Sequence, residues 1–356
     1  MVAGSPSYEP YRALELPPTK ASPGQLRLRY FGTSTLLVSD GATSLLIDGF
    51  FSRPSFSRLV FGTLAPNEER IRAALNAGGV AMKSGDGLAP EVEGRTKLDA
   101  ILVAHSHHDH ALDSAAVAQL TGATVFGSES TRIIGRAQGF PGVHYEVVDY
   151  GHTEEIGATK INVTFLRSVH SPTPLPEGGV SEAFRSPAHL FRFKPDKLYA
   201  YQLQHSSTGI LVVPSGSFEP GAFANVRPYV VLLGIGSLGK HDCASLKRYW
   251  DAAVRETKAK LVIPIHWDHF GKGLEEGLRP LPRILDRFDK TIPRLLKLAN
   301  RDHVAIRFLP LYEEVALTAD VPDLHQQEEL RRSLPEADCE FGAPAPTPDA
   351  ASAQAK

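Results

Sequence analysis

His105-Ser106-His107-His108-Asp109-His110 directly follows the apolar run Ile101-Leu102-Val103-Ala104. The apolar run is typical of a buried strand, and a loop at the end of a strand can bring several side chains to one point. Four of the six loop residues, at positions 105, 107, 109 and 110, offer the imidazole or carboxylate ligands that zinc takes in proteins. A solvated polar loop is the alternative, but a chance match to this spacing is rare.

Two more histidines stand at the carboxyl ends of apolar runs. His170 follows residues 161–169, and His266 follows residues 261–265. A single histidine in such a place is more often a hydrogen-bonded structural residue than a ligand. Because the ends of strands at one edge of a sheet can converge, three such cases in one chain favour metal ligation.

The chain between residues 25 and 315 alternates strand and helix patterns. Residues 25–30 have a period of two, and residues 36–38 and 45–47 flank Asp40-Gly41, a hairpin signal. Further strand-like apolar runs cover 101–104, 161–169, 210–213, 230–233, 261–265 and 305–309. Helical patterns cover 68–77, 113–120, with Asp113 as N-cap, and 246–254. This order predicts a layered α/β protein whose sheets are covered by helices.

The two ends of the chain differ from this middle part. Residues 1–24, rich in Pro and Ser, are predicted to form an extended arm, and 316–341 a C-terminal segment with helical character. Residues 342–356 are mostly Ala, Pro and small polar residues, which indicates a disordered tail. Neither a signal peptide nor an apolar run of membrane-spanning length is readable, so we expect a cytoplasmic protein without a membrane span.

Composition narrows the possible partners. The 356 residues carry a net charge of -2 and a pI near 6.7, without the basic stripe of a nucleic-acid binder, so a small-molecule substrate is expected. Cys243 and Cys339 are the only cysteines, which excludes a disulfide framework and a four-cysteine zinc site. Cys243 shows no partner pattern. The oligomeric state is left open.

The ordered motifs resemble the metallo-β-lactamase superfamily over about residues 25–315. Leu46-Ile47-Asp48-Gly49 is similar to the early strand-end Asp of that family, the loop 105–110 to its signature motif, and His170 and His266 to its later ligands. The resemblance implies a four-layer αβ/βα sandwich, classed as α/β or in some schemes α+β, with the site along one edge of both sheets. It also implies two zinc sites, formed by His105, His107 and His170 and by Asp109, His110 and His266, with Mn or Fe as other divalent metals.

Some motifs point to one branch of the superfamily. Phe31-Gly32-Thr33-Ser34, the extra histidine of the signature loop and Ile263-Pro264-Ile265-His266-Trp267-Asp268 resemble ascorbate-6-phosphate lactonase-like enzymes and N-acyl-phosphatidylethanolamine phospholipase D. The substrate is not fixed by this resemblance, because the fold hosts many hydrolytic reactions.

One position departs from the family pattern. After the run 210–213, Ser217 stands where the family normally has an Asp that bridges two metals. Serine is a poor ligand and carries no charge, so the second metal is expected to bind weakly, to use another ligand or to be absent. The candidate substitutes are His205, His241, Asp242 and His269, each of which is at least as well explained as a surface or hydrogen-bonding residue.

The predicted function is metal-assisted hydrolysis of an ester, lactone, amide or phosphodiester small molecule, with Asp109 and His110 as catalytic residues. Zinc lowers the pKa of a bound water from 15.7 to about 7. Asp48 is predicted to orient a ligand histidine, and Trp267 and His269 to line the pocket. The apolar stretch 50–64 is interpreted as a substrate wall or lid, or equally as core packing or a subunit contact.

Three alternatives remain at this point. A nuclease of the same fold is disfavoured by the mildly acidic charge, and an iron enzyme by the lack of an electron-transfer domain after residue 315. The third is a non-catalytic or mononuclear relative that binds a ligand, and only Ser217 supports it.

Overall fold

Two mixed sheets form the centre of the protein. The computed structural model describes residues 4–84, 87–88, 94–318, 320 and 322–342, so the predicted disordered tail lies outside the described residues except for Gly342. The first sheet has the order β16 (Glu314–Ala316), β1 (Arg27–Tyr30), β2 (Leu36–Ser39), β3 (Ser44–Ile47), β6 (Ala100–Leu102), β7 (Thr124–Gly127) and β8 (Tyr145–Val147). The second has the order β15 (Ala305–Ile306), β14 (Leu261–Ile265), β13 (Val230–Gly234), β12 (Gly209–Val213), β11 (Tyr199–Gln204), β10 (Ile161–Arg167) and β9 (Thr153–Ile156). A separate short hairpin joins β4 (Lys83–Ser84) and β5 (Gly87–Leu88).

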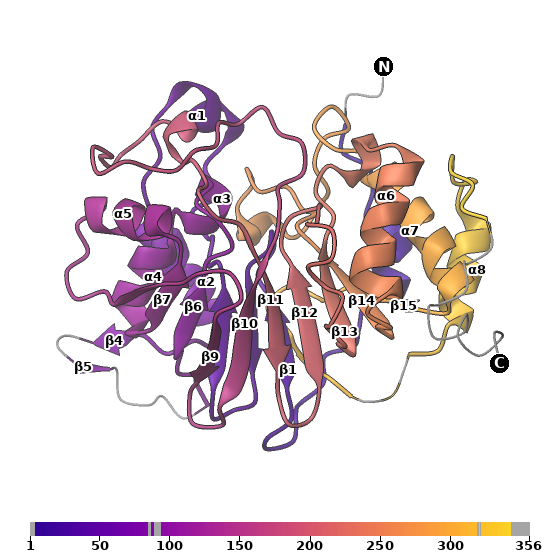
Figure 1. Ribbon diagram of the computed structural model, residues 1–356, viewed down its shortest axis with the longest axis horizontal. Helices are drawn as coiled ribbons and strands as arrows, with labels where there is room; N and C mark the ends of the chain where they lie inside the picture. Colours follow the sequence, from indigo (N-terminus) through magenta and orange to yellow (C-terminus); the bar gives the residue numbers. More distant parts are fainter. Residues whose placement is uncertain (1–3, 85–86, 89–93, 319, 321, 343–356) are drawn as a thin grey trace.

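Strand direction brings the important strand ends to one edge. In the first sheet β2 and β3 form the predicted hairpin, and β3 runs parallel to β6. In the second, β10 and β12 both run antiparallel to β11, while β12, β13 and β14 are parallel to one another. The carboxyl ends of β10, β12, β13 and β14 therefore lie at the same edge, near the short helices α1 (Phe56–Phe61) and α3 (His108–Ala111) (Figure 1).

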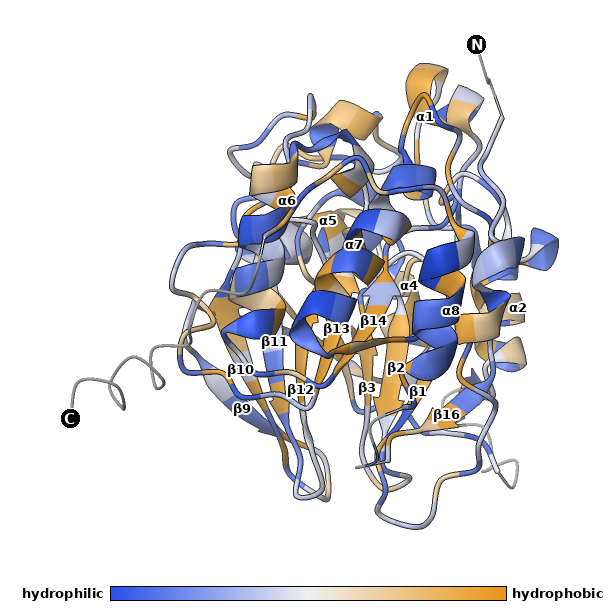
Figure 2. Cartoon of the chain, turned by 90° about the vertical axis from the view of Figure 1, so that its right-hand side faces the viewer, coloured by the Kyte–Doolittle hydropathy of each residue, from blue (hydrophilic) through white to orange (hydrophobic). Residues whose placement is uncertain are grey.

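Helices cover the outer faces of both sheets. The first sheet is covered by α2 (Glu68–Ala77), α4 (Ser114–Thr121) and α5 (Glu129–Ala137), and the second by α6 (Cys243–Trp250) and α7 (Phe288–Asp302), with α8 (His325–Ser333) beside α7 (Figure 1). An apolar cluster fills the space between the sheets, and two more lie under the helices. The helices turn polar residues outward over apolar strands (Figure 2). The predicted four-layer sandwich is confirmed.

The three predicted helices are present with small differences. The first spans Glu68–Ala77, as expected, and Asn67 caps it by accepting a hydrogen bond from the Arg70 amide. The third begins at Cys243 and continues beyond Trp250 as a π-helical turn over Asp251–Arg255. Asp113 occupies the N-cap position of α4, but its carboxylate accepts from the amides of Phe51 and Ser52 instead of capping its own helix.

The predicted N-terminal arm is packed rather than extended. Residues Glu9–Leu14 form a 3-10 helix, and Tyr11 and Leu14 are buried in the cluster beneath α6 and α7. The ring of Tyr8 stacks on Trp267 with centroids 4.6 Å apart. Burial of these apolar side chains stabilises a segment whose composition alone gave no periodic signal.

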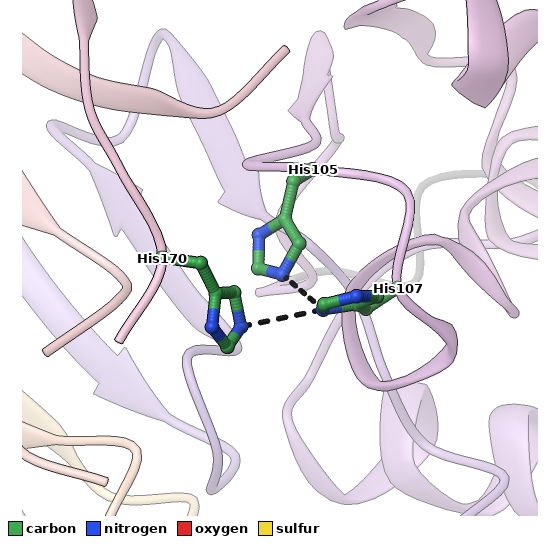
Figure 3. A group of neighbouring side chains, drawn as sticks. All are labelled: His105, His107 and His170. Atoms are coloured by element: carbon green, nitrogen blue, oxygen red, sulfur yellow. Dashed lines mark hydrogen bonds between the residues drawn. The ribbon is translucent and has the colours of Figure 1, made fainter. Parts of the chain in front are cut away.

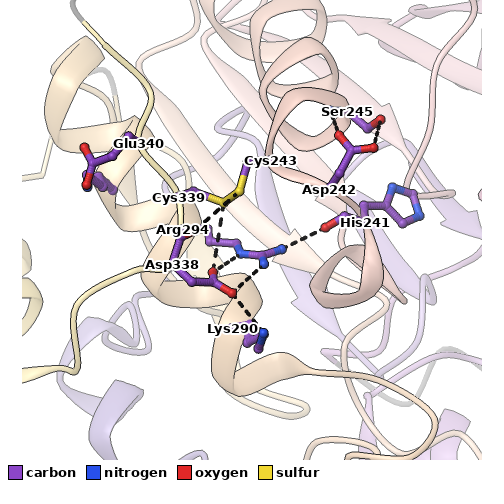
Figure 4. The surroundings of a disulfide bond; sticks show 10 residues. His241, Asp242, Cys243, Ser245, Lys290, Arg294, Asp338, Cys339 and Glu340 are labelled. Carbon is purple, nitrogen blue, oxygen red and sulfur yellow. Dashed lines mark hydrogen bonds and ion pairs between the residues drawn. A yellow bond between two sulfur atoms is a disulfide. The ribbon is translucent and has the colours of Figure 1, made fainter.

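The two cysteines correct the expectation that Cys243 has no partner. They form a disulfide that spans 96 residues and joins the start of α6 to the segment after α8 (Figure 4). Asp338, beside Cys339, accepts hydrogen bonds from Arg294 and Lys290 on α7. The pairing depends on how this segment folds back, which two isolated cysteines cannot indicate. Disulfides persist mainly in oxidising compartments, so this pair gives the cytoplasmic prediction no support.

Across the described residues, every helix is too short or too polar to span a membrane.

Candidate metal centre

Three histidines form the first half of the centre. The loop after β6 carries His105 and His107, and His170 comes from the loop after β10 (Figure 3). Nε2 of His105 lies 3.0 Å and Nε2 of His170 lies 3.3 Å from the same atom, Nδ1 of His107. Nitrogen ligands of a tetrahedral zinc ion lie about 3.3 Å apart, given Zn–N bonds of about 2.0–2.1 Å. The spacing of these three nitrogens therefore fits a bound cation.

The protonation of this trio also suits a cation. Burial holds the pKa of His105 well below its usual value and lowers that of His107 to about 3, so both rings are neutral near pH 7. Nδ1 of His170 lies 2.6 Å from the carbonyl oxygen of Ser171. Donation to that carbonyl places the proton of His170 on Nδ1 and leaves a lone pair on Nε2. A cation between the three nitrogens can accept a lone pair from each neutral ring.

Asp109, His110 and His266 form the second half. Oδ2 of Asp109 lies 3.3 Å from Nε2 of His266 and 3.8 Å from Nε2 of His110. Burial acts to raise the pKa of Asp109, but His110 and His108 outweigh it and hold the pKa well below its usual value. The rings of His105 and His110 have centroids 3.9 Å apart, so the two trios adjoin. Each trio brings its ligand atoms within 4.8 Å of one another, which is close enough to hold one metal ion.

Asp48 lies behind His110, at the end of β3. Its Oδ2 is 2.8 Å from Nδ1 of His110, and Oδ1 accepts a hydrogen bond from the amide of Ala104 at 2.7 Å. Ser34 donates its hydroxyl to the same carboxylate. Nε2 of His110, in contrast, is buried and has no hydrogen-bond partner in the described part of the chain. A ring bonded on one nitrogen and free on the other is the arrangement of a metal ligand with a supporting carboxylate.

His266 is held through its backbone. Its φ of 58° lies in the left-handed region, which a residue with a Cβ rarely adopts. The amide of His266 donates to the carbonyl oxygen of Thr33 at 2.5 Å. Gly236 packs against it, since a Cβ there would lie 3.0 Å from Nδ1 of His266. The end of β14 is therefore fixed by the loop after β1.

Other predicted site residues lie elsewhere. His205 follows β11, which runs opposite to its neighbours, and its Nε2 is 3.2 Å from Asp40 in the hairpin turn between β2 and β3. Asp242 caps α6 by accepting from the amide of Ser245 at 2.7 Å. The carbonyl of His241 accepts from Arg294 at 2.9 Å (Figure 4). The structure does not bring these three side chains into either trio.

Trp267 and His269 also depart from the expected placement. Trp267 is buried between Tyr8 and Phe288, in the cluster under α7. His269 packs against Phe56, with ring centroids 4.9 Å apart, and lies outside the wall of the pocket. Sequence proximity to His266 was misleading because β14 ends at Ile265 and the backbone turns at His266, where φ is 58°.

A pocket of about 400 Å³ opens on both trios. His107, Asp109, His170 and His266 line its floor. The loop after β12 contributes Pro214, Ser215 and Gly216 to the wall, and Ser217 is not among its lining residues. The other lining residues are Phe56, His108, Ser171, Pro172, Thr173, Pro174, Leu175, Gly236, Ser237, Lys240, Phe270, Leu281 and Leu285. Sequence reasoning missed most of this wall because it comes from loops without periodic signals.

His108 is a pocket residue that the sequence presented only as an extra histidine. Its ring is buried, and neither nitrogen has a hydrogen-bond partner in the described residues. The rings of Phe50 and Phe270 pack against the His108 ring, at centroid distances of 5.9 and 6.2 Å. Burial lowers its pKa, so the ring is neutral near pH 7.

The apolar stretch 50–64 serves two purposes. Phe50, Phe51, Leu59 and Leu64 belong to the core under α2 and α4, as the packing interpretation expected. Phe56 lines the pocket, as the wall interpretation expected.

Two facing mixed sheets, helices on both outer faces and a His-x-His-x-Asp-His loop at one edge define the metallo-β-lactamase fold. No protein-family model matches the chain. Over 181 residues it is 30% identical to the UPF0173 metal-dependent hydrolase of Myxococcus xanthus (strain DK1622), covering 49% of this chain and 57% of that protein. The chain thus spans little more than half of this relative.

Solved structures resemble the chain more loosely. Igni18, a metallo hydrolase from Ignicoccus hospitalis, is 16% identical with a TM-score of 0.49, covering 83% of this chain and 100% of that one. The metallo-beta-lactamase fold protein YhfI from Bacillus subtilis is 13% identical with a TM-score of 0.46, covering 82% and 99%. The chain's own two sheets and the helices on their outer faces define its fold.

Proposed function

We propose that the protein is a metal-dependent hydrolase that acts on an ester, lactone, amide or phosphodiester of a small molecule. The observation that carries this proposal is the pair of adjoining trios, each of which contributes two residues to the floor of one pocket. His105, His107 and His170 would hold one ion, and Asp109, His110 and His266 a second. We propose zinc as this metal, with Mn or Fe as the other divalent candidates. A divalent cation bound there supplies Lewis acidity, which lowers the pKa of a water and polarises a substrate oxygen.

The side chains around the metal centre would orient the attacking water and the substrate. Asp109 faces the pocket, so a carboxylate oxygen that the metal does not use can accept a hydrogen bond from the attacking water and orient it. His110, bonded to Asp48, is fixed beside it. The residues above the floor restrict water access and position the substrate.

The pocket wall indicates what the non-reacting part of the substrate resembles. Phe56, Leu175, Phe270, Leu281 and Leu285 present apolar surface. Among the described residues of the wall, outside the two trios and His108, Lys240 is the ionisable side chain, and its Nζ donates to the carbonyl of Ile284 at 2.9 Å. We therefore propose a substrate with an aliphatic or aromatic arm beside the scissile bond.

The test combines metal analysis with turnover. Purified protein should contain at least one equivalent of zinc or a similar ion, and His107→Ala and His170→Ala should lose it together with hydrolysis. With p-nitrophenyl esters, kcat/KM should rise from acetate to hexanoate, and Phe270→Ala should reduce that rise. Less than one equivalent of metal after reconstitution, or full activity of His107→Ala, would refute the proposal.

A mononuclear ligand-binding relative is the second candidate. The loop after β12 places Pro214, Ser215 and Gly216, and hence no carboxylate, at the pocket. Metal binding without turnover of any ester or phosphodiester would favour this candidate.

A further inference from the structure

A buried ion pair lies next to the second trio. Nη1 of Arg53, in the loop after β3, is 2.7 Å from Oδ2 of Asp268, two residues after the ligand His266. Their side chains are 2% and 1% exposed. Two buried charges are retained only where each neutralises the other and further hydrogen bonds satisfy them. The geometry of this pair is therefore tightly constrained.

Arg53 and Asp268 are both hydrogen-bonded to the loop that follows β1. Oδ1 of Asp268 accepts from the amide of Thr33 at 2.5 Å and lies 3.2 Å from the hydroxyl of Tyr30. Nη2 of Arg53 donates to the carbonyl of Phe31 at 3.3 Å and to the hydroxyl of Thr33 at 3.2 Å. Thr33 has a φ of 53°, so these bonds hold a conformation that the residue would not prefer alone.

The same loop supports both histidines of the second trio. The carbonyl of Thr33 accepts from the amide of His266, and the next residue, Ser34, donates to Asp48 and lies 3.1 Å from Nδ1 of His110. A displacement of Thr33 would therefore move the supports of His266 and His110 together. His105, His107 and His170 have no hydrogen bond to this loop in the described structure.

We infer that Arg53 and Asp268 are positioning residues that set the metal affinity of Asp109, His110 and His266 without touching the ion. Their effect passes through Thr33 and Ser34. The ion pair also requires a glycine at position 32. A Cβ at this position would lie 2.1 Å from Nη2 of Arg53 and 2.8 Å from Oδ2 of Asp268. The inference rests on the proposed metal centre but does not require hydrolysis.

The experiment is a zinc titration by calorimetry on the full metal-free chain and two variants. Arg53→Met removes the guanidinium bonds, and the near-isosteric Asp268→Asn keeps the shape but removes the charge. Each should weaken the second zinc equivalent at least about 10-fold, the scale on which supporting groups act, and change the first less than about threefold. Hydrogen exchange of the metal-free variants should be faster in peptides containing residues 33 and 266. Arg53→Lys, which keeps the charge, should show a smaller loss.

Arg301→Met is the matched control. Arg301 forms a partly buried pair with Asp302 on α7, with side-chain exposures of 10% and 5%, and its ion pairs with Asp302 and Asp251 lie away from the loop after β1. An equal selective loss in this control, an equal loss at both ions in Arg53→Met and Asp268→Asn, or no loss in either would overturn the inference. Failure of the wild type to bind zinc would instead refute the proposed function. If Arg53→Met does not fold, Asp268→Asn alone decides between these outcomes.

Discussion

Oδ2 of Asp48 lies 2.8 Å from Nδ1 of His110, with both side chains fully buried. The contact joins the end of β3 to the loop after β6, and the amide of Ala104 binds the other carboxylate oxygen at 2.7 Å. Asp48 thereby fixes both the orientation of the His110 ring and the nitrogen that carries its proton. The opposite nitrogen is left to face Asp109.

Asp48→Asn tests this relationship. The amide can place only one oxygen, so either Ala104 or His110 loses its acceptor, and the second metal should bind about 10–100-fold more weakly. Competitive zinc titration of wild type and variant measures the difference. Asp40→Asn, in the distant hairpin turn, is the control and should leave both affinities unchanged. An unchanged second affinity in Asp48→Asn would show that His110 needs no such support.

Much of the fold could be predicted because many of its strands and helices have a recognisable local sequence pattern. The apolar runs at 210–213, 230–233 and 261–265 are the strands β12, β13 and β14, and the helix at 68–77 is α2. The same logic predicted that His105, His170 and His266 converge, since each follows a strand whose end reaches one edge. Their division into two trios was implied only by the resemblance to the metallo-β-lactamase superfamily.

The sequence failed where the outcome depends on distant packing. β11 was missed, and with it the reversal that puts His205 at the opposite edge of the sheet. The long helix α7 was missed because Pro293 interrupts its pattern. The Cys243–Cys339 pair and the stack of Tyr8 on Trp267 join segments that only the folded chain brings together.

The loop after β12 yields a prediction about the missing carboxylate. Because Ser215 lines the pocket and Ser217 does not, Ser215→Asp should strengthen the second metal site at least about 10-fold, whereas Ser217→Asp should change it less than threefold. A carboxylate next to two dications reduces their mutual repulsion. Calorimetric titration of both variants is the test. If only Ser217→Asp strengthened the second metal site, Ser217 rather than Ser215 would correspond to the bridging Asp of the family.

Asp113 should make stability depend on pH. Burial raises its pKa to about 6 from an ordinary value of 3.8, against the opposing hydrogen bonds of Ser52. The native state therefore binds more protons than the unfolded state between about pH 4 and pH 6, and stability falls as pH rises through that window. The shift corresponds to a loss of at most about 3 kcal/mol.

Asp113→Asn should remove this loss. Its free energy of unfolding, measured in urea, should equal that of wild type near pH 4 and exceed it above pH 6. Every other titrating group contributes equally to wild type and variant, so its effect cancels in the difference between their free energies of unfolding. A constant difference across the whole range would mean that the Asp113 carboxyl titrates near its ordinary value in the native protein.

The disulfide supplies the final prediction. Cys243 and Cys339 close a loop of 96 residues, and a link of this kind stabilises a protein by about 2–4 kcal/mol. Cys243→Ala/Cys339→Ala should lower the free energy of unfolding by that amount, and dithiothreitol should lower wild type to the level of the variant without affecting the variant. Lys297→Ala, which removes the exposed contact with Glu340 in the same segment, should cost less than about 1 kcal/mol. Two free thiols by mass spectrometry in the unreduced protein, or no response to dithiothreitol, would contradict the pairing.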